Sequence, residues 1–240
     1  MHIVQIDAHV QAYFIVIRKK MFTQKSFLSF WQQMDIASEY YDAIKNFEIA
    51  FTNFFVQRGF KYTSWIDVVR AESLLKPGEN VYAKQIGALV CKHHFPIIKK
   101  KTINLAYFAE FYKAYCFFRK YSKFPLHWLD EYFHSNGDND AIFSLDQLGE
   151  FYYNHKNIFV FGHGMWGRNM EAYFKYEGWE IKGIVVSKKK SDDGTNIIEL
   201  KDFKMEENDG LIIALEYETY YKFKYLFKGI NGAILQPKNR

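Results

Sequence analysis

One carboxylate near the start of the chain lies among aromatic residues, at a spacing that could support acid–base chemistry. Glu48 belongs to the segment NFEIAFTNFFVQRGF, eleven residues before Gly59. A carboxylate that is partly removed from water has a raised pKa and can take the proton of a hydroxyl nucleophile. Glu48 is therefore a candidate general base. The alternative is a solvated helix residue that pairs with Lys45 or Arg58.

A glycine pattern in the last third of the chain is the second candidate site. Gly162, Gly164 and Gly167 form GxGxxG between the apolar run NIFVF and a helical pattern. There, the first glycine permits a tight turn, the second lets the backbone approach a pyrophosphate, and the third lets the helix pack on the strand. Instead of the acid that holds the NAD ribose, Ser187 and three lysines at 188–190 follow the next strand, which favours NADP or a nucleotide sugar. A purely structural turn is the alternative.

Two further polar clusters have a better explanation than metal binding. Asp138 and Asp140 form a DxD spacing in the polar loop at 135–141, where helix capping accounts for both residues. The CKHH cluster at 91–94 has adjacent histidines, which do not share a face of a helix or strand. The sequence therefore predicts no metal site.

Three elements are expected to position Glu48. An aromatic and β-branched strand is predicted at 9–17, a helix at 26–33 with Ser26 as its N-cap, and a second helix at 38–58 that stops at Gly59. Apolar residues recur at helical spacing along the second helix, which indicates a buried face. They are Ile44, Phe47, Phe51, Phe54 and Phe55. Glu48 lies beside this stripe, at the edge of the buried face.

A basic and aromatic helix is predicted at 104–121. Its aromatic residues recur at helical spacing, so packing in a core is the default interpretation, and docking on a membrane surface is the alternative. From residue 157 onward, strands and helices alternate. The predicted strands are 157–161, 180–186, 211–215 and 232–235, with a helix that ends at Gly178 and another at 218–227. This alternation predicts a parallel sheet with right-handed crossovers.

Composition limits the class of protein. The 240 residues are 49% hydrophobic and 20% aromatic, which is typical of a globular chain of one or two domains. The apolar run at 12–17 is far shorter than the roughly 20 residues that span a bilayer. A net charge of +5, concentrated in short runs, is weak for a nucleic-acid surface. Solvated basic loops are the default interpretation of these runs, and attraction to anionic lipid headgroups is the alternative. Two distant cysteines, together with a start that lacks a secretion signal, indicate a cytoplasmic protein.

Four elements follow one another over the first hundred residues. They are a His-x-Gln-x-Tyr-Phe strand, a Phe-x-x-Phe-Trp helix start, a Glu-containing helix that runs into Gly-Phe, and the basic stretch HHFPIIKKK at 93–101. The residues of the first three are His9, Gln11, Tyr13, Phe14; Phe27, Phe30, Trp31; and Glu48, Thr52, Gly59, Phe60. In this order they resemble the rhamnan synthesis F family of bacterial glycosyltransferases.

The resemblance implies a site and a reaction. Glu48 would be the base in an inverting transfer of a sugar from a nucleotide sugar to a glycan acceptor, which could be lipid-linked, during cell-wall or surface-polysaccharide synthesis. Gln11 and Tyr13 would line the acceptor side. The family's donor-binding half, with the acidic metal motif of a GT-A fold, would precede His9. Either a partner chain supplies it together with any divalent metal, or the chain is a fragment or degenerate relative in which that half is lost. The alternative is a noncatalytic nucleotide-binding or scaffold subunit.

These inferences predict an α/β protein of two domains. Residues 1–134 would form a partial GT-A-like glycosyltransferase portion, 135–155 a linker and lead-in helix, and 156–240 a Rossmann-like domain with a parallel sheet. The expected location is the cytoplasm, either free or peripherally associated with the inner face of the membrane.

Overall fold

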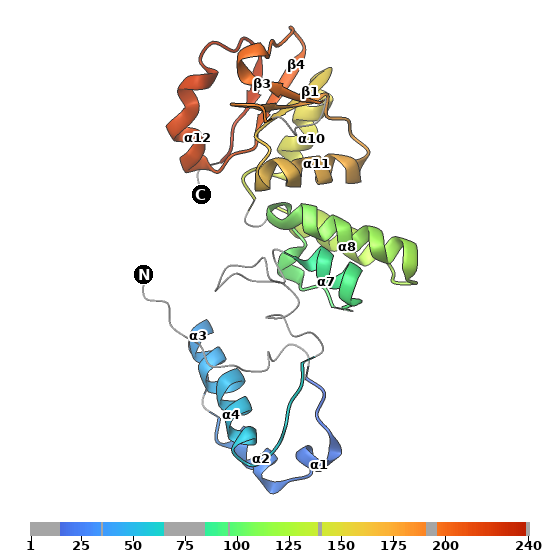
Figure 1. Cartoon of the computed structure of the whole chain (residues 1–240), viewed down its shortest axis with the longest axis vertical. Coiled ribbons are helices and arrows are strands. Elements are labelled where there is room, and N and C mark those ends of the chain that lie inside the picture. Colours follow the sequence, from blue (N-terminus) through green and yellow to red (C-terminus); the bar gives the residue numbers. More distant parts are fainter. Residues whose placement is uncertain are drawn as a thin grey trace. The chain divides into compact units, whose positions relative to one another are not determined.

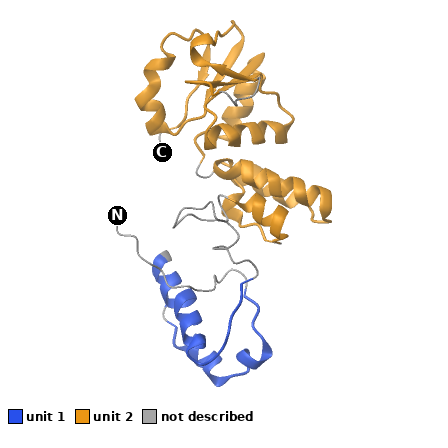
Figure 2. Ribbon diagram, in the orientation of Figure 1, with its two compact units in different colours: residues 1–73 blue, residues 74–240 orange. Residues whose placement is uncertain are grey.

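The computed structural model describes residues 15–34, 36–64, 85–95, 97–138, 141–190 and 196–238. The chain forms two compact units, Met1–Ser73 (unit 1) and Leu74–Arg240 (unit 2), which Figure 2 shows in different colours. This division lies well before the boundary at 135–155 that the sequence indicates.

Helices make up the regular structure of the described part of unit 1 (Figure 1). They are α1 (Lys19–Phe22), α2 (Lys25–Gln32), α3 (Tyr40–Ala43), the π-helical segment η1 (Ile44–Ile49) and α4 (Ala50–Val56). The last three are continuous, so the predicted helix at 38–58 is confirmed, although its middle is a π-helix that the sequence did not indicate. Gly59 ends it with a φ of 80°, a backbone conformation that favours glycine.

Phenylalanine side chains form the core of the described part of unit 1. Phe30 of α2 is buried against Phe51 and Phe55 of α4. The ring centroids of Phe51 and Phe55 are 4.9 Å apart, and those of Phe30 and Phe51 are 5.5 Å apart in an edge-to-face arrangement. The predicted apolar stripe therefore does hold the two helices together.

Unit 1 differs from the sequence-based expectations at the start of α2 and before α1. The N-cap of α2 is Gln24, whose side chain makes no capping hydrogen bond, so the assignment of this role to Ser26 was wrong: the helix begins one residue earlier and Ser26 lies inside it. Of the strand predicted at 9–17, residues 9–14 lie outside the described residues. Ile15 and Ile17 pack on the phenylalanine core without belonging to a strand.

Unit 2 contains a five-stranded parallel sheet, which confirms the α/β fold class. Its strand order is β3-β2-β1-β4-β5. The strands are β1 (Asn157–Phe161), β2 (Gly183–Val186), β3 (Ile197–Glu199), β4 (Asp209–Ile213) and β5 (Ala233–Leu235). In the register, Phe159 of β1 lies between Gly183 of β2 and Leu211 of β4. The sequence predicted every one of these strands except β3, whose three residues follow the lysine-rich loop.

A hydrophobic core covers each face of the sheet. Alternate residues of a strand point to opposite faces, so neighbouring residues enter different cores. Ile158 and Val160 of β1 face one core, while Phe159 and Phe161 face the other. The first core is completed by α8 (Phe108–Tyr121), α9 (His127–Asn136), α10 (Leu145–Tyr153) and α11 (Met165–Glu177). The second includes residues of α12 (Tyr217–Phe223) and the 3₁₀ segments η4 (Leu200–Asp202) and η5 (Lys224–Phe227). Figure 1 shows α11 and α12 on opposite sides of the sheet.

Helix α8 confirms the prediction at 104–121, together with the short 3₁₀ segment η3 (Leu105–Tyr107) before it. Its Phe108, Phe111 and Ala114 are buried, so core packing is the correct interpretation of that face. The preceding elements are α7 (Ile86–His93), which packs on α8, and η2 (Lys100–Thr102). The buried Asn169 of α11 joins α8 to α11: its Oδ1 accepts from the Ala109 N–H at 3.0 Å and its Nδ2 donates to the Ala106 carbonyl at 2.7 Å.

The segment that the sequence indicated as a linker lies within unit 2. Helix α9 continues to Asn136, and Ala141, Ile142 and Phe143 are buried in the same core as Phe108 and β1. Helix α10 lies within the segment 135–155 and begins with a capping box between Ser144 and Gln147. Helices α8 and α9 thus share a hydrophobic core with the sheet.

Candidate functional site

The glycine turn connects β1 to α11 at the carboxyl end of the sheet. Gly162 has a φ of 103°, and its N–H donates to the carbonyl of Val185 in β2 at 2.8 Å. On the other side, Ala214 after β4 donates to the carbonyl of Phe161 at 2.9 Å. The turn therefore begins where both neighbouring strands of β1 are still hydrogen-bonded to it.

The three glycines have different surroundings. A Cβ atom on Gly167 would lie 2.0 Å from the carbonyl oxygen of Gly162, so only glycine lets the first turn of α11 approach the strand end this closely. A Cβ atom on Gly164 would meet nothing within 4 Å. Gly162 and Gly167 therefore meet backbone requirements of the turn, while Gly164 faces open space. Binding of a nucleotide by these residues stays a prediction.

The turn also lies at a reversal of strand order. The chain proceeds from β1 to β2 and β3 on one side, then returns to β4 and β5 on the other. In open parallel sheets, ligands bind outside the carboxyl ends of the strands at this kind of reversal. The indole Nε1 of Trp166 donates to the Glu216 carboxylate at 3.3 Å, which joins the first turn of α11 to the residue that precedes α12.

Two side chains of the turn region that the sequence did not single out carry exposed nitrogen groups. The Nε2 of His163 lies 3.4 Å from the Glu171 carboxylate, and an Nη of Arg168 donates to the carbonyl of His163 at 3.5 Å. Both are exposed. The free N–H groups at the start of a helix attract anions, and the Arg168 guanidinium adds a fixed positive charge beside them. The signal in the sequence is their position within and directly after GHGMWG.

Lysines follow β2, as the sequence indicated, and one of them contacts the next strand. The Nζ of Lys189 donates to the carbonyl of Ile197 at 2.9 Å, and its backbone N–H donates to the Glu199 carboxylate at 3.4 Å. The hydrogen bond from Lys201 to Glu199, together with that from Lys189, lowers the pKa of Glu199 below its usual value. Glu199 is thus an acid at the end of β3, and its carboxylate pairs with Lys201.

Glu48 lies in the π-helical segment of unit 1. Its side chain is half-buried, and its backbone carbonyl accepts from the Thr52 hydroxyl at 2.9 Å. Thr52 itself is buried beside Phe51. Short π-helical segments occur often at functional sites because the extra residue per turn displaces side chains from regular helical spacing. Gln11 and Tyr13, which the sequence assigned to the acceptor side, lie outside the described residues.

The two polar clusters that were not assigned to a metal have structural contacts. The Asp138 carboxylate accepts from the Leu145 N–H at 2.9 Å, in line with the expected capping role, while Asp140 lies outside the described residues. The Cys91 thiol contacts the carbonyl of Lys113 at 3.7 Å, and His94 ends α7 in a left-handed conformation. Across the described ranges, no three His, Cys, Asp or Glu residues are grouped to hold a metal ion.

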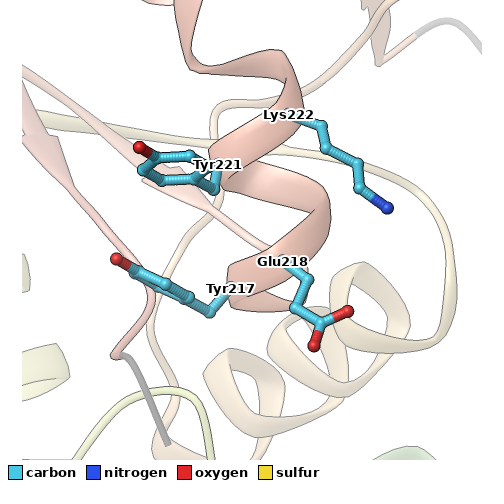
Figure 3. A pocket seen from close by; sticks show the side chains of 4 residues that line it. All are labelled: Tyr217, Glu218, Tyr221 and Lys222. Carbon is cyan, nitrogen blue, oxygen red and sulfur yellow. The ribbon is translucent and has the colours of Figure 1, made fainter.

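A shallow hollow of about 260 Å³ lies on α12, lined by Tyr217, Glu218, Tyr221 and Lys222. Figure 3 shows the two tyrosines on one side of the helix and Glu218 and Lys222 on the other. The tyrosine ring centroids are 6.2 Å apart. Because all four residues come from one helix, this is a surface depression and lacks the opposing wall that a binding cleft needs.

Comparison with protein families gives one match. Residues 2–119 match the family model described as rhamnan synthesis protein F. The match includes Glu48, continues through α7 and covers most of α8, so it extends the similarity seen over the first hundred residues. It connects this part of the chain with rhamnan or polysaccharide synthesis. Neither curated proteins nor solved structures give a match. In the part of the chain that the structure describes, no helix is both long and apolar enough to cross a bilayer.

Proposed function

We propose that this protein transfers a sugar, with rhamnose as the first candidate, from a nucleotide sugar to a glycan acceptor during polysaccharide synthesis. The observation that carries the proposal is the match to the rhamnan synthesis family over the segment that contains Glu48. The π-helical conformation and half-burial of that residue support it, because both distinguish Glu48 from a solvated residue on a regular helix.

In this reaction Glu48 acts as the general base. The acceptor hydroxyl attacks the anomeric carbon of the donor sugar while the Glu48 carboxylate takes its proton. The bond from the anomeric carbon to the diphosphate breaks on the opposite face, the nucleoside diphosphate leaves with the electron pair, and the configuration at that carbon is inverted. Gln11 and Tyr13 orient the acceptor.

The glycine turn supports a second candidate function, the binding of a nucleotide by a noncatalytic subunit. The close packing of Gly167 on the carbonyl of Gly162, where any Cβ atom would clash, and the open space at Gly164 are what a phosphate-binding turn requires. Arg168 and the lysines after β2 favour a phosphate-rich ligand such as NADP or a nucleotide sugar. This function does not depend on Glu48, so the two candidates can be tested separately.

Sugar transfer is tested by the Glu48→Gln substitution. The amide keeps the shape of the side chain but cannot take a proton, so transfer should fall by about 100-fold or more. The assay measures incorporation of labelled rhamnose from its nucleotide donor into the polysaccharide of membranes from cells that carry either the unchanged protein or the variant.

The matched control for this assay is Glu39→Gln, which changes an exposed residue just before α3. It should retain full activity. Equal melting temperatures of the two variants would show that the fold is intact. Near-normal transfer by Glu48→Gln would remove the base assignment and favour the noncatalytic function.

Nucleotide binding is tested by thermal unfolding of the full chain with NADP, NAD or a nucleotide sugar. At a ligand concentration 100 times the Kd, binding adds about 2.7 kcal/mol to the free energy of unfolding. Gly164→Val should lose this effect because its side chain fills the open space where the phosphates bind. Gly229→Val is the control, since a Cβ atom there also meets nothing within 4 Å and the residue lies outside the turn. An unchanged melting temperature with every nucleotide would refute this function.

A further inference from the structure

A continuous row of aromatic rings covers the end of α8 and the start of α9. We call it the α8–α9 aromatic surface, and it consists of Phe117, Phe118, Tyr121, Phe124 and Trp128. Successive ring centroids are 5.0 Å apart for Tyr121 and Phe117, 6.2 Å for Phe117 and Phe118, 5.5 Å for Phe118 and Phe124, and 6.4 Å for Phe124 and Trp128. Tyr121 is 63% exposed, Trp128 60% and Phe124 40%. These rings therefore form one apolar patch that faces solvent.

The backbone beneath this surface is held by local hydrogen bonds. The Ser122 hydroxyl donates to the carbonyl of Phe118 at 3.0 Å and accepts from the N–H of Phe124 at 3.1 Å. The N–H of Trp128 donates to the carbonyl of Pro125 at 3.1 Å. At its start, α8 is joined to α11 by Asn169. The rings are thus presented in a preformed arrangement, which lowers the entropic cost of binding.

The charge along the segment that carries the rings is mainly positive. Arg119, Lys120 and Lys123 are exposed, and the sequence from 119 to 129 contains no acidic residue. The first acid after it, Asp130, accepts hydrogen bonds from the hydroxyls of Tyr115 at 3.3 Å and Tyr176 at 2.6 Å. The negative charge of Asp130 is therefore engaged with tyrosines of α8 and α11. The next acid, Glu131, is exposed about one turn beyond Trp128, so the rim is positive from 119 to 127 and carries one acid at its end.

We infer that the α8–α9 aromatic surface docks on the surface of an anionic lipid bilayer. Tyrosine and tryptophan rings settle at the boundary between headgroups and acyl chains, and phenylalanine reaches slightly deeper. Lysine and arginine side chains extend from the same depth to the lipid phosphates and carboxylates. The aromatic patch therefore matches the boundary between headgroups and acyl chains, and the positive rim matches the anionic headgroups above it. This inference does not depend on the proposed sugar transfer or on nucleotide binding.

Helix α12 shows why the charge decides the assignment. Together with η5, which follows it, α12 also exposes aromatic side chains: Tyr221 of α12 is 57% exposed and Tyr225 of η5 is 58% exposed. Around them, however, Glu216 and Glu218 balance Lys222 and Lys224 in the sequence. The aromatic surface of α12 and η5 therefore carries acids and bases together, so it is less complementary to anionic lipids and serves as an internal control.

The test is co-sedimentation of the full chain with lipid vesicles. We expect binding to vesicles of phosphatidylcholine with about 30% phosphatidylserine and little binding to pure phosphatidylcholine, with the difference reduced by salt. The variant Tyr121→Ser with Trp128→Ser should lose about tenfold or more in partitioning because both interfacial rings are removed. Lys120→Glu with Lys123→Glu should lose at least as much, because it reverses two charges at the rim.

The control variant, Tyr221→Ser with Tyr225→Ser, removes two similarly exposed rings from α12 and η5 and should bind like the unchanged protein. Circular dichroism and melting temperature establish that all variants are folded. Equal binding to neutral and anionic vesicles, an equal loss in the α12 control, or binding that single-stranded nucleic acid displaces would each overturn the assignment. Absence of sedimentation at low salt would do the same.

Discussion

Glu48 lies in a helix pair whose described core consists mainly of Phe30, Phe51 and Phe55, whereas the glycine turn follows a strand that is buried on both faces. The first candidate site is supported by a family match, and its geometry by local helix contacts. The second candidate site is supported by the close packing of Gly167 on Gly162, which an added methyl group would disrupt. It lies outside the residues that match the family.

The difference shows that similarity and structure point to separate parts of one chain. In unit 1, the order of sequence motifs around Glu48 indicates the chemistry, and the helices around it pack on segments close in the chain. In unit 2, long-range packing fixes the turn, and residues from 103 onward contribute to that packing. The two units should therefore respond very differently to deletion and to single substitutions.

Deletion of chain segments should have the largest effect. A chain of residues 74–240 should fold, because it retains both cores of the sheet. A chain of residues 135–240 should not fold, because it lacks Phe108, Phe111 and Phe133, each fully buried. Every such side chain contributes about 1.5–3 kcal/mol, so their combined loss is comparable with the 5–15 kcal/mol that stabilise a typical domain.

Circular dichroism and thermal melting measure the outcome. A cooperative transition in the chain of residues 135–240 would contradict the shared core and would support an independent domain that begins after α9.

Substitution in the glycine turn should have the next largest effect. Gly167→Ala should lower the free energy of unfolding of unit 2 by about 3 kcal/mol or more, because its Cβ would overlap the carbonyl of Gly162. Gly164→Ala is the matched control and should change stability by less than about 1 kcal/mol, since its Cβ faces open space and its φ is −79°. Urea denaturation compares the two. Similar losses in both variants would mean that the close approach does not determine the turn.

In unit 1, Phe55→Ala should disrupt the helix pair by about 3 kcal/mol, since Phe55 is 3% exposed and its ring contacts Phe27, Phe30 and Phe51. Amide hydrogen exchange should show faster exchange along α4 and unchanged exchange in β1 and β4. Slower or unchanged exchange in α4 would indicate that this core does not support the helix. A change in β1 would contradict the separation into two units.

The smallest expected effect concerns pH. Burial, followed by the hydrogen bond to Asp130, raises the pKa of Tyr115 to about 12 from its ordinary value of 10.0. A group whose pKa is raised by folding contributes stability that is fully present below the unfolded pKa and is lost as pH rises toward the folded one. The stability of unit 2 should therefore fall between about pH 10 and 12, and Tyr115→Phe should make that fall shallower.

Chemical denaturation across this pH range measures the difference. Tyr225→Phe, which alters an exposed tyrosine, should leave the fall unchanged. A fall of the same size in Tyr115→Phe and in the unchanged protein would show that the Tyr115 hydroxyl does not stabilise the packing of α8 on α9.

Much of the local structure could be predicted because it depends on short-range patterns. The helix at 104–121, the helix that ends at Gly178 and four of the five strands follow from apolar periodicity and glycine positions. The tight turn at Gly162 and the close approach at Gly167 also follow from a motif placed between a strand and a helix. The start of α2 was misplaced by one residue, because Ser26 is a good cap by type although it lies inside the helix.

The sequence by itself determined the α/β alternation, the glycine turn and the similarity around Glu48, since each is written in residues that are close together in the chain. Only the tertiary structure decided that α8 and α9 share a core with the sheet, that β3 pairs beside β2, and that the middle of the Glu48 helix is a π-helix. The physical reason is the same in the first two cases. By sequence alone, the polar loop at 135–141 resembles a domain boundary and the three residues of β3 resemble a loop. Both are identified only through partners distant in the chain, which are the core for the first and β2 for the second.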